Sequence, residues 1–192
     1  MLRSRTIKTL AALLVTMTVG SLALVAMETA PIRPEVTHLA AVIAPADDAT
    51  KLVSATAVPL RRATWRNIVI HSSVEGEAMA SQCHFVVRAV PGSDGQYVQA
   101  MGLWKQQQAG RHLSGKLADE SIGIFVTGRF DTRGPSAGQF GALTGLAQGL
   151  QQACGINADR VYLARELDPR CGSPGKMFPL NRFNATLLAY AN

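Results

Sequence analysis

Five short runs of mainly apolar residues follow one another between residues 66 and 163, and most of them are bounded by glycine, serine or aspartate. Runs of this length that are rich in valine, isoleucine or phenylalanine are typical of β-strands. The run Ile122–Val126 contains no polar side chain, which predicts a strand covered on both faces of its sheet. The predicted strands are Arg66–His71, His84–Val90, Tyr97–Met101, Ser121–Thr127 and Arg160–Leu163.

The segment between the second and third predicted strands has the composition of a tight turn. Pro91–Gly95 reads PGSDG, and proline, serine, aspartate and glycine each favour turn backbone. Two strand-like runs joined by such a turn predict a β-hairpin. We therefore expect the second and third strands to be antiparallel neighbours.

A long helix is predicted after the fourth strand. Ser136 and Gln139 have capping-box spacing, in which the serine caps the helix and the glutamine side chain reaches back to it. Apolar residues then recur at helical spacing, and Gly155 ends the pattern. These apolar residues are Phe140, Leu143, Leu146, Ala147, Leu150 and Cys154. Asn181–Tyr190 predicts a short terminal helix. Strands followed by a helix and a further strand predict an α/β fold, a single domain with a central mixed β-sheet flanked by helices.

The N-terminal 30 residues have the pattern of a targeting segment. Arg3, Arg5 and Lys8 precede the mainly apolar run Leu10–Met27, whose length lies between a signal-peptide core and a membrane-spanning helix. A cleaved signal peptide and an uncleaved membrane anchor both remain open. Basic residues ahead of the run keep that end in the cytoplasm, so the rest of the chain is predicted to be exported to the periplasm or cell envelope.

Residues 31–60 are rich in proline and alanine without a sustained period, which predicts a linker with a short helix near Asp48–Ala55. The globular domain is then expected to cover residues 61–192. The net charge of +6 is compatible with an anionic cell wall, and no basic block interleaved with aromatic residues indicates nucleic-acid binding. Of the three cysteines, export permits a disulfide between Cys154 and Cys171, while the position of Cys154 on the apolar helix stripe favours a buried thiol.

His71 stands where the first predicted strand ends. It is either a strand-end side chain without a ligand, or a metal ligand or general base. Six motifs in order decide how we interpret it: WRNIVIHSS, HFVVRAVPGSDGQYVQ, LWKQQQAGRHLSG, SIGIFVTGRFD, PSAGQFGALTGLAQGLQQACGI and RVYLARELDPRCGSPGKMF. This series resembles the zinc amidases of the N-acetylmuramoyl-L-alanine amidase family, which includes the peptidoglycan recognition proteins. The resemblance covers most of the chain from Trp65 to Phe178.

The resemblance implies a zinc hydrolase chemistry. In the family a catalytic zinc takes three protein ligands, leaves a fourth position for water and polarises the scissile amide. The first ligand matches His71, the second is the histidine of a G-H-R-[ED] motif, and the third is usually the cysteine of C-P-G. A tyrosine ahead of the H-F strand and a residue shortly before C-P-G assist the reaction.

This sequence departs from the family at those positions. Ala164 stands where the second histidine is expected, and a methyl group cannot bind a metal. Ser173-Pro174-Gly175 replaces C-P-G, with Cys171 two residues earlier. Cys83 takes the place of the assisting tyrosine, and Arg170 lies near the place of the basic helper, as a candidate catalytic residue. The segment between His71 and His84 is also shorter than the family pattern, so part of the groove wall is expected to be missing.

Two other side chains could complete a ligand set. Cys171 matches the third position if Gly172 and Ser173 are an insertion, and His112 matches a family histidine near the groove, which makes it a possible substitute ligand. The resemblance also implies that His112, Trp104 and Ser121 contact a ligand, although Trp104 could equally pack in the core. We therefore expect a vestigial zinc site without a bound cofactor, in a protein that binds peptidoglycan or muropeptide weakly or has a structural role. The alternative is an active zinc-dependent amidase with a rearranged ligand set.

Overall fold

The computed structural model of the chain describes residues 46–189. These residues belong to one compact unit, Ala41–Asn192. The targeting segment predicted for residues 1–30 and the first part of the predicted linker lie outside the described residues. Within residues 46–189, no helix combines the length and the apolar character that a membrane crossing requires.

A five-stranded mixed sheet forms the centre of the domain. Its strands are β1 (Asn67–Ser72), β2 (Phe85–Val87), β3 (Val98–Ala100), β4 (Ser121–Val126) and β5 (Val161–Leu163). The strand order is β3-β2-β4-β1-β5. The pairs β1–β4, β1–β5 and β2–β4 are parallel, and the pair β2–β3 is the predicted antiparallel hairpin. The α/β fold class, the mixed sheet and all five predicted strands are confirmed, although β2 is shorter than the run that predicted it.

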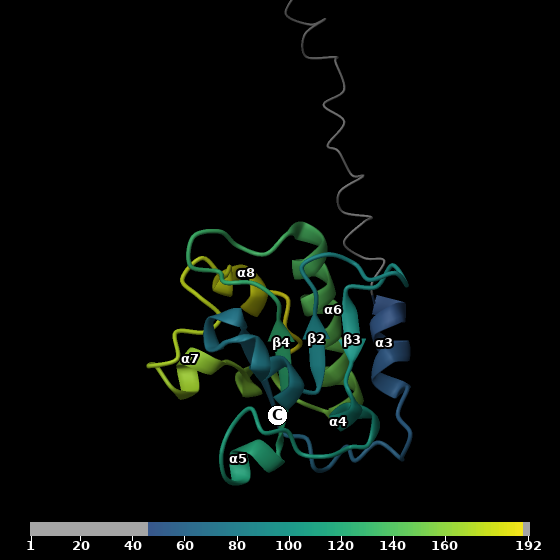
Figure 1. The fold of residues 1–192 in the computed structure, drawn as a ribbon. Helices are drawn as coiled ribbons and strands as arrows, with labels where there is room; N and C mark the ends of the chain where they lie inside the picture. The colour runs from purple at the N-terminus through teal and green to yellow at the C-terminus, as the bar shows by residue number, and fades with distance from the viewer. Residues whose placement is uncertain (1–45, 190–192) are drawn as a thin grey trace, which may run out of the picture. The chain divides into compact units, whose positions relative to one another are not determined.

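One long helix, α6 (Ala137–Cys154), covers one face of this sheet, and Figure 1 shows it behind the strands. The Ser136 hydroxyl accepts a hydrogen bond from the Gln139 backbone N–H at 3.2 Å, and Gly155 ends the helix with a φ of 69°. The prediction that the Gln139 side chain reaches back to bond with Ser136 is wrong. Its amide nitrogen instead donates to the carbonyls of Thr127 at 2.8 Å and Val87 at 3.4 Å, because the buried start of the helix lies over the ends of β2 and β4.

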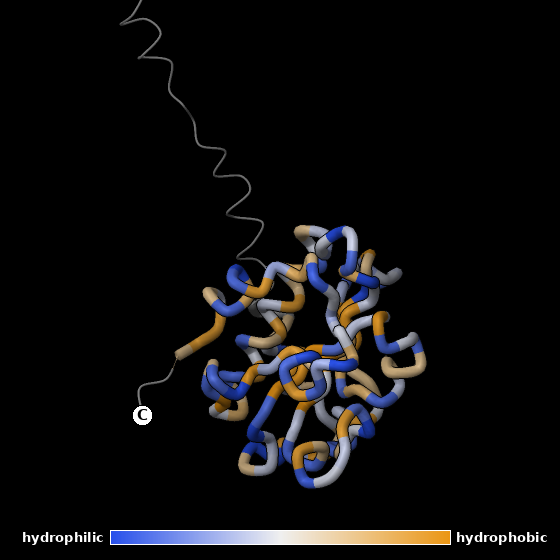
Figure 2. The backbone as a smooth tube through the Cα atoms, turned by 90° about the vertical axis from the view of Figure 1, so that its left-hand side faces the viewer, coloured by the Kyte–Doolittle hydropathy of each residue, from blue (hydrophilic) through white to orange (hydrophobic). Residues whose placement is uncertain are grey.

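The hydrophobic core lies between α6 and the face of the sheet that it covers. Figure 2 shows apolar residues gathered along the strands and the helix, with polar residues along the outer loops. Because side chains alternate across a strand, the residues between the core positions point to the opposite face, where the candidate site lies. The core residues of the strands are Ile68, Ile70, Phe85, Val87, Ile122, Ile124, Val126 and Leu163.

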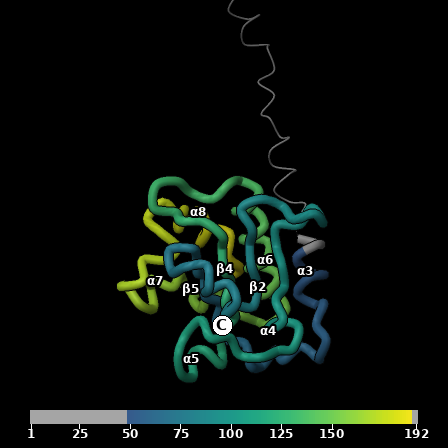
Figure 3. Tube along the Cα trace, viewed as in Figure 1, coloured from purple at the N-terminus to yellow at the C-terminus, as the bar shows by residue number. Residues whose placement is uncertain are grey.

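The helix α3 (Ala46–Ser54) lies along the β3 side of the domain and packs against α6, as Figure 1 and Figure 3 show. Val53 is 2% exposed, and its carbonyl accepts a hydrogen bond from the Trp104 indole at 3.2 Å. The short helix predicted near Asp48–Ala55 is therefore present. It packs against α6 in the same compact unit as the residues after 61.

The remaining helical segments are short and lie mainly in the connections. The terminal helix α8 is Leu180–Asn184, so it is shorter than the predicted Asn181–Tyr190, and Tyr190 lies outside the described residues. Cys83, Cys154 and Cys171 are all free thiols. The other short segments are η1 (Ser73–Glu75), η2 (Glu77–Gln82), α4 (Gly102–Lys105), α5 (Lys116–Asp119), η3 (Ala158–Arg160) and α7 (Ala164–Leu167).

Candidate functional site

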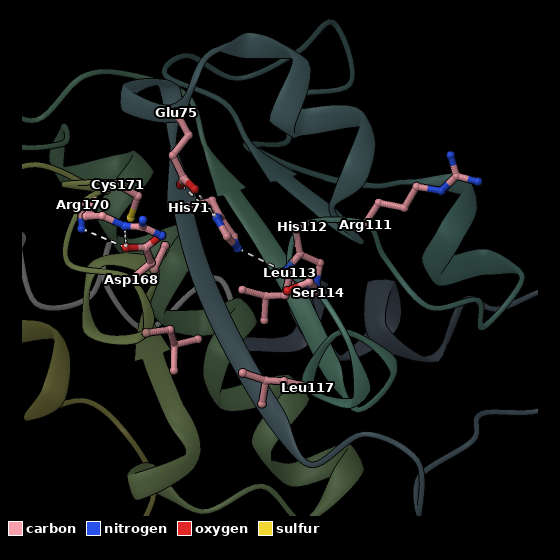
Figure 4. Close-up of a pocket in the computed structure, with 12 residues that line it drawn as sticks. His71, Glu75, Arg111, His112, Leu113, Ser114, Leu117, Asp168, Arg170 and Cys171 are labelled. Atoms are coloured by element: carbon pink, nitrogen blue, oxygen red, sulfur yellow. Dashed lines mark hydrogen bonds and ion pairs between the residues drawn. The ribbon is translucent and has the colours of Figure 1, made fainter.

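His71 lies near the end of β1, on the face of the sheet opposite α6. Its side chain is 1% exposed, and both ring nitrogens have partners (Figure 4). Nδ1 lies 2.9 Å and 3.1 Å from the two carboxylate oxygens of Glu75, and Nε2 lies 3.1 Å from Nδ1 of His112. The strand exit therefore carries a connected row of three polar side chains, Glu75, His71 and His112.

Gly123 of β4 provides the space for the His112 ring. A Cβ atom built at Gly123 would lie 2.6–2.9 Å from three ring atoms of His112, closer than real Cβ atoms approach. The ring is 5% exposed, and its Nε2 donates to the Ser121 carbonyl at 3.3 Å. The glycine of the SIGI motif thus allows a histidine from a distant loop to lie flat against the strand.

His84 has a structural role beside these residues. It is fully buried, its Nδ1 accepts a hydrogen bond from the Gly123 N–H at 2.9 Å, and its Nε2 donates to the Gln108 carbonyl at 2.9 Å. Its ring contacts the Trp65 ring edge-on, with centroids 4.9 Å apart. Because both ring nitrogens bond to backbone groups, His84 ties the loop that carries His112 to the sheet.

Burial keeps the two inner histidines neutral. It lowers the pKa of His84 to about 4, and burial together with the charge of His71 and His84 lowers the pKa of His112 to about 3. Since His112 Nε2–H donates to a carbonyl, its Nδ1 has a free lone pair and accepts from His71 Nε2–H.

The same hydrogen bonds indicate an ion pair between His71 and Glu75. Burial alone would raise the pKa of Glu75, but hydrogen bonds and charge from His71, with further bonds from Ser173 and Ser72, hold it below the ordinary value. A carboxylate only accepts hydrogen bonds, so His71 Nδ1 must donate to it. Both ring nitrogens of His71 are therefore engaged by protein partners.

These residues line a pocket of about 510 Å³. Ala164 contributes only a methyl group to the wall of the pocket. Cys171 also lines the pocket, and burial raises the pKa of its thiol. The Arg170 guanidinium is held by the Asp168 carboxylate through two contacts of 3.0 Å at the exposed rim, and the Arg111 side chain extends away from His71 in Figure 4. The other lining residues are Glu75, His112, Leu113, Ser114, Leu117 and Leu167.

No protein-family model matches this chain, and a search of curated proteins finds no match either. Solved structures do match. The endolysin N-acetylmuramoyl-L-alanine amidase LysCS from Clostridium intestinale superimposes over 68% of this chain and 88% of its own, with 18% identity and a TM-score of 0.51. AmiD from E. coli, solved with the substrate anhydro-N-acetylmuramic acid-L-Ala-D-γ-Glu-L-Lys, covers 64% of this chain and 57% of its own, with 20% identity and a TM-score of 0.54.

The chain has an amidase-like fold. AmpDh3 from Pseudomonas aeruginosa matches it in the same way, with 18% identity, a TM-score of 0.53, and coverage of 64% of this chain and 59% of its own. At these identities the likeness establishes the architecture, and the chemistry has to be argued from the residues of this chain.

The residues of this amidase-like domain do not fit a catalytic zinc. Such a site needs three ligand side chains around one point, with lone pairs free to bind the metal. Within residues 46–189, no group of three or more histidine, cysteine or acidic side chains is arranged in this way. His71 directs both ring nitrogens at protein partners, and Ala164 has no donor atom.

Some of the other predicted site residues line the pocket, and others are buried away from it. Trp104 is fully buried and packs on Phe85, with ring centroids 4.9 Å apart, so it lies in the core and does not line this pocket. Ser121 is also fully buried and lies outside the pocket; its carbonyl holds His112, and its hydroxyl has no hydrogen-bond partner among the described residues. Cys83 is buried, and burial raises its thiol pKa well above the ordinary range. His71, His112, Cys171 and Arg170 do line one pocket.

Sequence reasoning missed Glu75 and Ser173. Glu75 follows His71 by four residues, and Ser173 stands at the position that matches the family cysteine. Ser173 is fully buried, and its hydroxyl lies 3.2 Å from that of Ser72. An acidic residue shortly after a strand-end histidine was the available signal for Glu75. No local pattern marks Ser173 as the partner of Ser72.

We expect Gly123→Ala to lower the free energy of unfolding by about 1–3 kcal/mol, because the added methyl group overpacks the buried His112 ring. The matched control is Gly141→Ala on α6, where a Cβ meets nothing within 4 Å. Alanine is the better helix former, so this control should be neutral or more stable by up to about 1 kcal/mol. Urea unfolding of both variants measures the difference, and equal stabilities would contradict the packing argument.

Proposed function

We propose that this chain is an exported cell-envelope protein whose amidase-like domain binds peptidoglycan fragments weakly and does not hydrolyse them. The observation that carries the proposal is the arrangement around His71. Both of its nitrogens are engaged by Glu75 and His112, and Ala164 offers no donor atom at the neighbouring position. The N-terminal basic residues and apolar run support export.

The shape and chemistry of the pocket support the binding of a muropeptide. Its volume of about 510 Å³ is in the range of small-molecule sites, roughly 300–1,000 Å³. Leu113, Leu117 and Leu167 offer an apolar surface, while Ser114 and Arg170 offer polar contacts at the rim. The related fold of AmiD was solved with a muropeptide substrate, which supports the same ligand class here. The segment between His71 and His84 is shorter than the pattern of the resembling family, which supports weak rather than tight binding.

One observation favours the second candidate, an active zinc amidase with a rearranged ligand set. The 3.1 Å between His71 Nε2 and His112 Nδ1 is close to the roughly 3.3 Å expected between two nitrogen ligands of one tetrahedral zinc. Cys171 lines the same pocket and could be a third ligand. This candidate requires both histidines to exchange their present hydrogen bonds for a metal.

Two assays on the purified protein test the proposal. Release of stem peptide from peptidoglycan should be undetectable with zinc supplied, because positioned catalytic groups that each contribute about 10²–10⁴-fold are absent. Calorimetric titration with a muramoyl-tetrapeptide should show weak binding. Leu117→Glu should weaken this binding about tenfold by placing a charge in the pocket, and the matched variant Val90→Glu, at an exposed position outside the pocket lining, should leave it unchanged.

The outcomes separate the candidates. Zinc-dependent release that His71→Ala abolishes would contradict the proposal and establish the rearranged amidase. If neither release of stem peptide nor binding of the muropeptide is detected, the proposed binding role is contradicted. The fold would then be a structural or protein-interaction module.

A further inference from the structure

We propose that the Glu75 carboxylate is an internal partner of His71 in this pocket, which occupies His71 Nδ1 in place of a metal ion and so competes with metals for His71. The proposal explains why the residues of this pocket do not suit zinc. Like the proposed function, it rests on matching His71, Ala164 and Ser173 to the ligand positions of the family. It does not depend on muropeptide binding.

The contacts of Glu75 carry this inference. Both of its carboxylate oxygens lie within hydrogen-bonding distance of the same nitrogen, His71 Nδ1, at 2.9 Å and 3.1 Å. His71 is one of the three positions matched to family ligands, and the carboxylate is bonded to it directly. Another of these positions, Ala164, lines the same pocket and leaves space beside them.

Ser173 is itself held in place. It is fully buried, and its hydroxyl lies 3.2 Å from the Ser72 hydroxyl, which donates to the Pro174 carbonyl at 3.2 Å. A serine hydroxyl is a far poorer zinc ligand than a cysteine thiolate, and this one is already bonded to Ser72. The position matched to the family cysteine therefore does not offer a good metal ligand.

The turn that carries Glu75 is anchored on both sides. The Ser72 hydroxyl caps the turn by accepting a hydrogen bond from the Val74 N–H at 3.3 Å. The turn ends at Gly76, whose φ is 93°. Ser73 fastens the turn to the chain after β4, because its hydroxyl accepts from the Gly128 N–H at 2.8 Å and its own N–H donates to the Gly128 carbonyl at 3.2 Å. The carboxylate is 12% exposed, so it is held in the pocket rather than in solvent.

A metal at His71 would have to displace this arrangement. A nitrogen binds zinc through a lone pair, whereas His71 Nδ1 donates a hydrogen bond to Glu75 and Nε2 is bonded to His112. Supplying the missing third ligand is therefore not enough to build a metal site. The competing carboxylate has to be removed as well, and this is the distinctive consequence of the proposal.

Zinc affinity of four full-length proteins tests it, measured by competition with a chromophoric chelator and checked by cobalt absorption. They are the wild type, Ala164→His, Ala164→His with Glu75→Gln, and Ala164→His with Glu77→Gln. Glu77 is an exposed glutamate in the next helical turn and serves as the matched control. We expect weak zinc binding by the wild type and by Ala164→His. Adding Glu75→Gln should tighten binding by at least about tenfold, and adding Glu77→Gln should not change it.

Three results would overturn the proposal: stoichiometric zinc binding by the wild type, equal affinities for the two double variants, or weaker binding when Glu75 is replaced. The last would show that Glu75 is a metal ligand and not a competitor.

A measurement on the wild type keeps the test valid if a double variant does not fold. The ¹⁵N spectrum of the histidine rings should show a proton on Nδ1 of His71. A lone pair on Nδ1 would contradict the bond to Glu75 on which the proposal is built.

Discussion

Lowering the pH from about 7 to about 4 should reduce the free energy of unfolding by on the order of 3–6 kcal/mol. The main cause is the pair of buried neutral histidines, His84 and His112, whose pKa values are lowered from 6.5 to about 4 and about 3. The unfolded chain takes up their protons as the pH falls through 6.5, and the folded chain takes them up only near the lower values. Between these limits each histidine lowers the stability by about 1.4 kcal/mol per pH unit.

Glu75 adds to this loss at the acid end. Its pKa in the folded chain is held below the ordinary value of 4.5, so its stabilising contribution is present above that value. The contribution is lost as the pH falls through the lowered pKa. The histidine effect therefore begins below about pH 6.5, and the Glu75 effect follows below about pH 4.5.

Urea unfolding at a series of pH values measures the slope. Replacing His84 by glutamine removes one of the two titrating groups and should reduce the slope near pH 5 by about half. A stability that stays constant between pH 7 and pH 4.5 would show that the two rings are not held neutral by burial.

A chain that begins at Arg61 should be less stable than one that begins at Ala41 by about 3–5 kcal/mol. The shorter chain lacks α3, whose Val53 and Ala49 are 2% and 6% exposed against α6. It also loses the bond from the Trp104 indole to the Val53 carbonyl, and the bond from the Ala57 N–H to the Lys105 carbonyl at 2.9 Å. Losing α3 therefore uncovers part of the core and of the fully buried Trp104.

Thermal and urea unfolding of the two chains give the comparison, with the fluorescence of the buried Trp65 and Trp104 reporting exposure of the core. Val53→Ala in the longer chain isolates one buried side chain and should account for about 1–2 kcal/mol of the difference. Equal stabilities of the two chains would mean that α3 only rests on the domain and that the boundary at residue 61 is sound.

The candidate site could be read from the sequence only in part. His71 at a strand end and His112 in its loop were found because a motif order pointed to them, and both line the pocket. Trp104 and Ser121 belong to the same motifs but face inward, since α4 and the start of β4 are covered by α3 and by the histidine loop. Motif membership identifies a region of the fold and does not identify which side chains reach the pocket.

The sequence by itself determined the elements and the fold class. Strand composition, the PGSDG turn, the Ser136 cap and the Gly155 stop are local signals, because they depend on residues a few positions apart. The tertiary structure alone decided that α3 joins the core, that Gln139 bonds to the strand ends, and that Glu75 bonds to His71. A buried polar side chain forms hydrogen bonds with whichever groups lie close to it in the folded protein. These groups often belong to another segment of the chain, so local sequence does not reveal them.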